Sequence, residues 1–364
     1  MTATDPQLPP ITCPSSLVAS CAPLLGFTPE RCLVAFVLGV PGRFGPVLVR
    51  IDLPRAGAES AWAEELAGSI RGTGGTGVDL VAWCDVPDTS TRQALVTVPA
   101  LHALWAALDG TAIDVLATLT TNGRVCWLHD CPDLCCERPR PLDPAVMTAV
   151  QAEYVYAGYA PLGSREALAA RVAPDASRTR CVARSLRNRR PARALERWRD
   201  IELAHLTGLL LPGEPPPSRS SALHSGTAAR FLGTPVDARL AARAIHALAD
   251  ITVRDTLLLR LVVADDHDPR AWRDTIDLMA DLTRCAPTGW AAPPATLLAI
   301  VAWMRGEGAL ASVALARAVK DDPGYRLAHL AREVIGRGMD PREWRRSMSG
   351  LTEAQCRGRD TTGG

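Results

Sequence analysis

Four cysteines and one histidine lie within eleven residues, in the segment C-W-L-H-D-C-P-D-L-C-C from 126 to 136. Zinc is commonly held by thiolates and imidazoles, and closely spaced thiols can also form a disulfide. Cys131, Cys135 and Cys136 are the candidate ligands. The segment lacks a second C-x-x-C pair, so it does not match a zinc finger or ribbon. Three alternatives stay open: a zinc site, a structural or regulatory disulfide, and thiols that pack as small apolar groups.

A basic stretch from 178 to 199 contains nine arginines and one acid, Glu196. Arginines on one segment can bind phosphates, so a polyanion could contact Arg187, Arg189, Arg190 and Arg193. The alternative is a solvated helix face, because arginine replaces lysine almost everywhere in this chain, where Lys320 is the only lysine. We therefore do not expect nucleic acid to be the main partner.

Two charged pairs are candidate structural anchors. Arg50 and Asp52 lie on one face of an expected strand. Arg254 and Asp255 are adjacent in an expected helix, where neighbouring side chains point about 100° apart. We therefore expect Arg254 and Asp255 to bind two different partners rather than each other.

The composition is that of an ordinary globular protein, with 47% hydrophobic residues and a net charge of +1 over 364 residues. A chain of this length usually divides into two domains. The sequence has no uncharged apolar run of membrane-spanning length and no recognisable signal peptide. We expect a cytoplasmic protein that does not enter a membrane.

Hydrophobic patterning predicts alternating strands and helices up to about residue 143, and helices alone after it. V-P-G-R-F-G and Thr121-Asn122-Gly123-Arg124 are turn sequences that predict two hairpins, so the sheet should be mixed. Strands are expected at 32–38, 47–53, 78–83, 112–119 and 125–128. Helices are expected at 15–25, 60–70, 91–108, 144–157, 164–172, 236–249, 252–264, 269–285, 294–305, 308–320, 325–337 and 341–347.

These elements predict a mixed β-sheet flanked by helices, followed by an all-α domain. Small residues at 299, 302, 311 and 318 resemble those of a tetratricopeptide helix pair. Five parts are expected: an α/β domain at 1–143, a helical connector with the arginine-rich stretch at 144–211, a Pro/Ser-rich linker at 212–226, a helical domain at 227–349, and a disordered tail at 350–364.

Several segments resemble an uncharacterised actinobacterial family, the domain of unknown function numbered 4192. They are P-L-L-G-F-T-P-E-R-C-L-V (23–34), V-R-I-D-L-P (49–54), C-P-D-L-C-C (131–136), A-P-L-G-S-R-E-A-L-A-A-R (160–171), V-R-D-T-L-L (253–258) and the helical segment 302–328. The resemblance covers most of the chain and implies no activity. It includes the three cysteines of C-P-D-L-C-C but not His129.

The leading hypothesis is a cytoplasmic, non-catalytic interaction or scaffold protein that binds a protein partner through its helical domain. It rests on that domain and on the lack of a recognisable catalytic motif. The alternative is a regulatory module that responds to metal or thiol redox state through Cys131, Cys135 and Cys136. A third hypothesis is an enzyme of unrecognised type with a pocket at the sheet. Zinc is the one cofactor that the sequence suggests.

Overall fold

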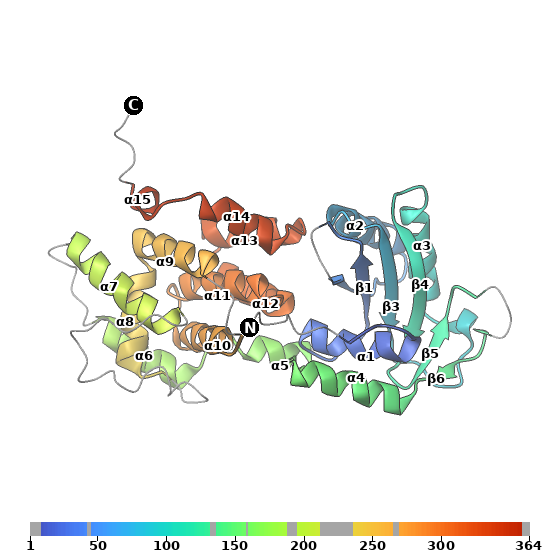
Figure 1. Cartoon of the computed structure of the whole chain (residues 1–364). Coiled ribbons are helices and arrows are strands. Elements are labelled where there is room, and N and C mark those ends of the chain that lie inside the picture. The colour runs from blue at the N-terminus through green and yellow to red at the C-terminus, as the bar shows by residue number, and fades with distance from the viewer. Residues whose placement is uncertain are drawn as a thin grey trace. The chain divides into compact units, whose positions relative to one another are not determined.

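The computed structural model describes residues 9–41, 45–131, 136–157, 159–187, 195–211, 236–264 and 269–358. The chain divides into two compact units between Ala167 and Leu168, with Gly336–Gly338 counted in the first unit. The first unit contains a mixed β-sheet with helices, and the second is helical (Figure 1). This arrangement confirms the predicted fold class.

The sheet of the first unit has the strand order β2-β1-β3-β4-β5-β6. β1 is antiparallel to β2 and to β3, β3 and β4 are parallel, and β4, β5 and β6 are antiparallel in turn. Both predicted hairpins are therefore confirmed. The strands are β1 (Cys32–Leu38), β2 (Val47–Asp52), β3 (Gly77–Trp83), β4 (Asp114–Thr121), β5 (Val125–Leu128) and the short β6 (Arg140–Pro141), which the sequence did not predict.

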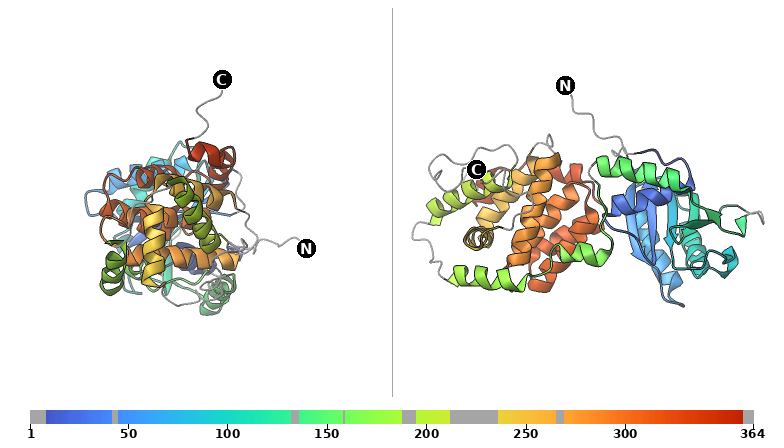
Figure 2. Two further views of the ribbon diagram at one scale, coloured as in Figure 1. Left: turned by 90° about the vertical axis from the view of Figure 1, so that its left-hand side faces the viewer. Right: turned by 90° about the horizontal axis from the view of Figure 1, so that it is seen from below.

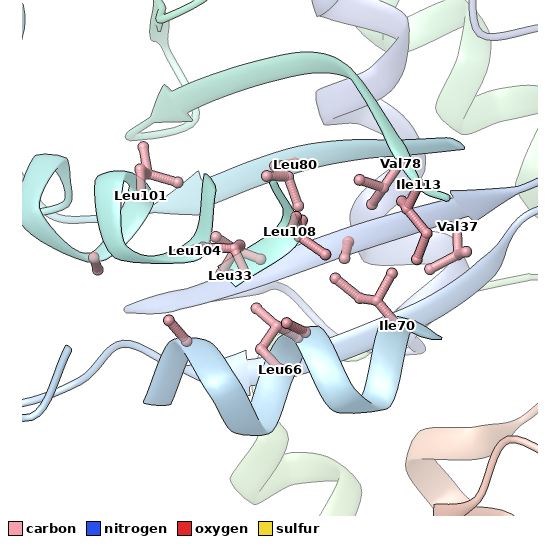
Figure 3. Packing of buried hydrophobic residues seen from close by; sticks show 14 of the residues in the cluster. Leu33, Val37, Leu66, Ile70, Val78, Leu80, Leu101, Leu104, Leu108 and Ile113 are labelled. Carbon is pink, nitrogen blue, oxygen red and sulfur yellow. The ribbon is translucent and has the colours of Figure 1, made fainter. Parts of the chain in front are cut away.

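One face of the sheet is covered by α2 (Glu59–Gly72) and α3 (Val98–Leu108). Alternate residues of β1 and β3 point to this face, which is why both strands are apolar at every second position. Leucines and other apolar residues of both helices pack on them with almost no exposed surface (Figure 3). Each such side chain contributes about 1.5–3 kcal/mol through burial. This layer is the main hydrophobic core of the first unit.

α1 (Pro14–Leu25) lies on the opposite face of the sheet, where Cys21 is beside Cys32 and Trp83. α4 (Pro144–Tyr156) packs along α1, through a small cluster that contains Ala19, Val150 and Tyr154 (Figure 2). The end of α1 is as predicted, because Gly26 adopts φ 78° and closes the helix.

Two helix starts differ from the sequence prediction. Cys13, rather than Ser15 or Ser16, is the N-cap of α1, and Ser16 completes a capping box with it. Pro99 does not interrupt a long helix over 91–108, because α3 begins at Val98 and Pro99 lies in its first turn. Proline is well tolerated there, since the first-turn amides have no partner within the helix. A 3-10 turn, η1 (Arg92–Ala94), precedes α3.

The second unit is built around a helix that is buried on every side. Ala292 to Trp303 of α11 are all buried, and α12 runs back antiparallel along α11. The remaining helices surround this pair. The helices after α4 are α5 (Arg165–Ala170), α6 (Ala176–Arg187), α7 (Leu195–Leu210), α8 (Ala238–Leu248), α9 (Ile251–Val263), α10 (Pro269–Cys285), α11 (Ala292–Met304), α12 (Gly308–Asp321), α13 (Arg326–Gly336), α14 (Pro341–Ser349) and α15 (Glu353–Cys356).

The structure divides the predicted connector at 144–211 between the two units, since α4 belongs to the first and α6 and α7 to the second. The predicted linker at 212–226 lies outside the described residues. The disordered tail at 350–364 stays a prediction. Its described part contains the short helix α15, where Glu353 pairs with Arg260 of α9 at 2.7 Å. No described helix is both long and apolar enough to cross a membrane.

Candidate functional site

The first half of β4 is an open edge of the sheet. β3 pairs with β4 along its whole length, whereas β5 pairs only with Leu119–Thr121. The amide of His129 adds one bond, to the Thr118 carbonyl at 2.9 Å. Within the described residues, Asp114–Ala117 have no strand on their outer side, and Figure 1 shows β5 beside only the end of β4.

A groove of about 730 Å³ lies beside this open edge. Its walls come from the end of α3, the loop that follows, the start of β4 and the residues after β5. Three aspartates line the groove, and no arginine or lysine does, so it is acidic. The lining residues are Trp105, Ala106, Leu108, Asp109, Gly110, Thr111, Ile113, Asp114, Val115, His129 and Asp130.

Trp105 forms the wall of the groove on the α3 side. Its indole N–H donates a hydrogen bond to the Thr118 hydroxyl at 3.2 Å. Its ring meets that of His129 edge-on, with 6.2 Å between the ring centroids. These contacts fix the indole, so this part of the groove is preformed.

His129 is held as a neutral imidazole. Its Nε2 lies 2.9 Å from the Thr120 hydroxyl, which lies 2.9 Å from that of Thr97. Burial, as the largest cause, and the neighbouring Arg92 and His102 together lower the His129 pKa to about 4. At neutral pH the ring therefore contributes a hydrogen-bonding group and an apolar face to the groove, but no charge.

A β-bulge sets the position of two carboxylates. Val78 pairs with Val115 but Asp79 pairs with Ala117, so Leu116 is the extra residue of β4. Beyond the bulge, the outward-facing amide of Thr118 donates to Oδ2 of Asp130 at 2.7 Å, and the Ala117 backbone bonds to Asp79.

Burial raises the pKa of both carboxyl groups, and the charge of Asp130 raises that of Asp79 further. Asp130 is exposed as a whole residue, although the bulge holds one of its oxygens. The bulge therefore places partly desolvated carboxylates next to the open edge.

The hydroxyls of Thr118 and Thr120 are fully buried and hydrogen-bonded, so they cannot act as nucleophiles toward a molecule in the groove. The available groups are carboxylates, a neutral imidazole, an indole face and the backbone of a strand whose outer edge is unpaired. These groups bind cations, apolar side chains and extended polypeptide.

The cysteine cluster is only partly described, since Cys135 lies outside the described residues. The carbonyl of Cys131 accepts from Arg92 at 2.8 Å, and the buried Cys136 thiol accepts from Arg140 at 3.3 Å. Among the described residues, no three histidine, cysteine, aspartate or glutamate side chains are arranged to hold a metal ion. Arginines therefore bind the Cys131 carbonyl and the Cys136 thiol.

Sequence reasoning missed one member of this cluster. Cys13 lies close enough to Cys126 for its charge to raise the Cys126 pKa, although burial is the larger cause. Hydrogen bonds from Ser16, the backbone amide first, lower the pKa of Cys13 itself. Cys126 is also the register partner of Arg140. The N-cap role of Cys13 could have been noted in the sequence, but its approach to β5 depends on the tertiary fold.

Comparison with known families gives one match. A profile of a domain of unknown function, DUF4192, matches residues 14–342. The chain belongs to the DUF4192 family. The match begins at α1 and ends in α14, so this family spans both compact units. No curated protein and no solved structure shows significant similarity to the chain.

The predicted anchors of this DUF4192 member bind mainly each other. Arg50 and Asp52 form an ion pair, and the Arg50 guanidinium lies 5.8 Å from the Phe27 ring. The expectation that Arg254 and Asp255 would not pair is wrong, because Arg254 Nε donates to Asp255 at 2.7 Å. The long arginine side chain spans the angle between adjacent helix positions. Arg254 also donates to the Tyr325 hydroxyl at 2.7 Å, so it does anchor α9.

The arginine-rich stretch is partly used in internal ion pairs. Arg178 binds Asp281, and Arg199 binds Asp250 through two hydrogen bonds of 3.1 Å. Arg187 is exposed at the end of α6, whereas Arg189, Arg190 and Arg193 lie outside the described residues. The described part of the stretch thus holds helices together, which weakens the case for a polyanion site.

Proposed function

We propose that this DUF4192 protein is a non-catalytic interaction protein that binds a protein partner at the open edge of β4. The observation that carries the proposal is the outer edge of Asp114–Ala117. Among the described residues no strand pairs with this edge, and the groove lies next to it. An exposed strand edge presents backbone donors and acceptors that a further strand satisfies.

The helical unit supplies rigidity in this proposal rather than the main contact. Its central helix α11 is buried on every side, so it has no free face to offer a partner. We therefore place the partner on the first unit instead of on the helical domain favoured by the sequence.

A site-specific cross-link tests the proposal. Leu116 is 55% exposed on the open edge, and Tyr156 of α4, at 96%, is the control because it lies in the same unit away from the groove. A photoreactive phenylalanine analogue replaces each residue in the full chain in living cells. We expect one discrete protein adduct from position 116 and none of that mass from 156.

The adduct is then identified by mass spectrometry and its purified partner is titrated. Leu116→Arg should weaken binding about tenfold or more, because it introduces a bulky charged side chain at the contact, whereas Tyr156→Arg should not. Identical adducts from both positions, or an affinity unchanged by Leu116→Arg, would refute the proposed site.

A further inference from the structure

We infer that the partner presents an extended segment with basic residues at alternate positions, which joins the sheet as a strand beside Asp114–Ala117. The inference rests on the function proposed above and specifies the chemistry of its partner. Three observations support the inference. They are the pairing register of β4, the different side chains on the two faces of the sheet at its open edge, and the acidic lining of the groove.

The first step is the direction of the backbone groups. In a parallel pair, successive residues direct their N–H and C=O groups to opposite sides of the strand. The amide of Asp114 donates to the Thr76 carbonyl at 2.9 Å, toward β3. The backbone groups of Val115 therefore point to the open side. Thr118 is the next residue to point outward, and Asp130 and His129 already satisfy it. An added strand bonds to β4 at Val115.

The second step is the spacing of the carboxylates. Asp114 pairs with Gly77, and Ala117 pairs with Asp79, which is two residues further along β3. Because of the bulge, Asp114 and Ala117 therefore lie on the same face of the sheet, as residues two apart in a regular strand do. Asp130 lies beside Ala117, because its carboxylate binds the next amide, that of Thr118. Asp114 and Asp130 are therefore on one face of the sheet, about 7 Å apart along the strand. Two basic residues at i and i+2 of an added strand match this spacing.

The third step is the opposite face. Val115 and Trp105 both pack against the core under α3, so the residue of the added strand between the two basic ones meets an apolar surface. Asp109 follows the last residue of α3, where the helix dipole also favours a cation. The complementary segment reads basic–apolar–basic, and an acidic segment is disfavoured by three carboxylates with no cation in the lining.

Selection from a displayed library of random peptides against the purified full chain tests the inference. We expect enrichment of lysine or arginine at alternate positions with an apolar residue between them. For a selected peptide, Asp114→Lys should reduce affinity about tenfold, since it reverses the charge at a basic residue of the peptide. Glu153→Lys is the matched control, because Glu153 is exposed on α4 away from the groove.

Backbone N-methylation of the peptide tests strand pairing itself. If the added strand runs antiparallel to β4, methylation of the residue that pairs with Val115 should abolish binding and methylation of the next residue should not. If it runs parallel, the pattern should reverse, because Val115 then bonds to the residues on either side of its partner. Equal effects at both residues would overturn strand addition. Enrichment of acidic peptides, or none, would overturn the basic partner.

The two proposals fail in different ways. A partner cross-linked at Leu116 whose contact segment lacks alternating basic residues overturns this inference and leaves the interaction function intact. A cross-link from Leu116 to a second copy of this chain also overturns the inference, because it identifies the occupant as β4 of another molecule. Absence of any adduct at Leu116 removes both.

Discussion

Asp321 should be among the most important polar side chains of the helical unit. From the end of α12 it binds the loop between α10 and α11, at the start of α11. Its carboxylate accepts from the amides of Gly289, Ala291 and Ala292 at 3.0, 2.7 and 3.1 Å. The side chain is 1% exposed and lies 3.5 Å from Arg317. The carboxylate therefore caps α11, whose own N-cap residue, Ala291, offers no side-chain oxygen.

Asp321→Ala leaves three amides without their acceptor and Arg317 without its partner. Loss of a helix N-cap costs about 1 kcal/mol, and each buried donor without a partner costs about 1–3 kcal/mol. Water can reach part of the turn, because the bond to Gly289 is exposed. We therefore expect a loss of about 3 kcal/mol in unfolding free energy. Asp321→Asn keeps one acceptor oxygen and should lose about 1 kcal/mol.

Amide hydrogen exchange of the full chain measures the loss of stability at the start of α11, and urea denaturation measures the loss of global unfolding free energy. A loss of 3 kcal/mol corresponds to a fall of about 100-fold in protection for residues 289–295. Asp322→Ala is the control, since Asp322 accepts a single local bond from Gly324 at 2.9 Å. A destabilisation by Asp321→Ala below about 1 kcal/mol, or equal to that of Asp322→Ala, would refute the capping argument.

Three further predictions concern the site and its support. The His129 pKa of about 4, against 6.5 for a free imidazole, means that the folded state takes up fewer protons than the unfolded state between these pH values. The contribution of neutral His129 to the unfolding free energy is complete above pH 6.5 and falls by up to about 2 kcal/mol as the pH drops to 4. The difference in unfolding free energy between wild type and His129→Asn should therefore shrink over that range. Urea denaturation at several pH values measures it. A Cβ on Gly77 would meet only the flexible end of Leu116 at 2.9 Å, whereas one on Gly75 would meet the Leu38 carbonyl at 2.8 Å. Thermal unfolding should therefore report a loss under about 1 kcal/mol for Gly77→Ala and a larger one for Gly75→Ala. Arg178→Gln should lower the unfolding free energy by about 2 kcal/mol, because Asp281 would lose its guanidinium partner. Asp281 also accepts from the Val236 amide at 2.8 Å. Arg184→Gln on the same helix should have a smaller effect.

Local sequence patterns determined the elements of this protein. Short apolar runs predicted the strands near 32–38 and 78–83, and the Asn122-Gly123 turn predicted the hairpin after β4, since these signals depend only on neighbours along the chain. Helix bounds in the second unit follow capping residues such as Asp237 and Asp340 in the same way. The family resemblance also came from short motifs in order, and the profile match confirms it.

The candidate groove could not be read from the sequence. Its lining comes from α3, the start of β4 and the residues after β5, which only the sheet order brings together. The bulge at Leu116 has no distinctive residue, because it arises from a mismatch in pairing with β3. The carboxylates of Asp79 and Asp130 are unremarkable in the sequence, because the amides that they bind come near them only in the folded sheet.

The cysteine segment shows what the local sequence indicates and what only tertiary contacts decide. Its residue types and spacing raised the possibility of metal or redox chemistry, and that hypothesis used only the local chain. Tertiary structure placed Arg92 against the Cys131 carbonyl and brought Cys13 from the N-cap of α1 toward Cys126. Contacts between distant segments depend on how layers pack, and no local pattern encodes them. The sequence therefore determined which elements form and which family the chain belongs to, whereas the packing of those elements decided which side chains share a site.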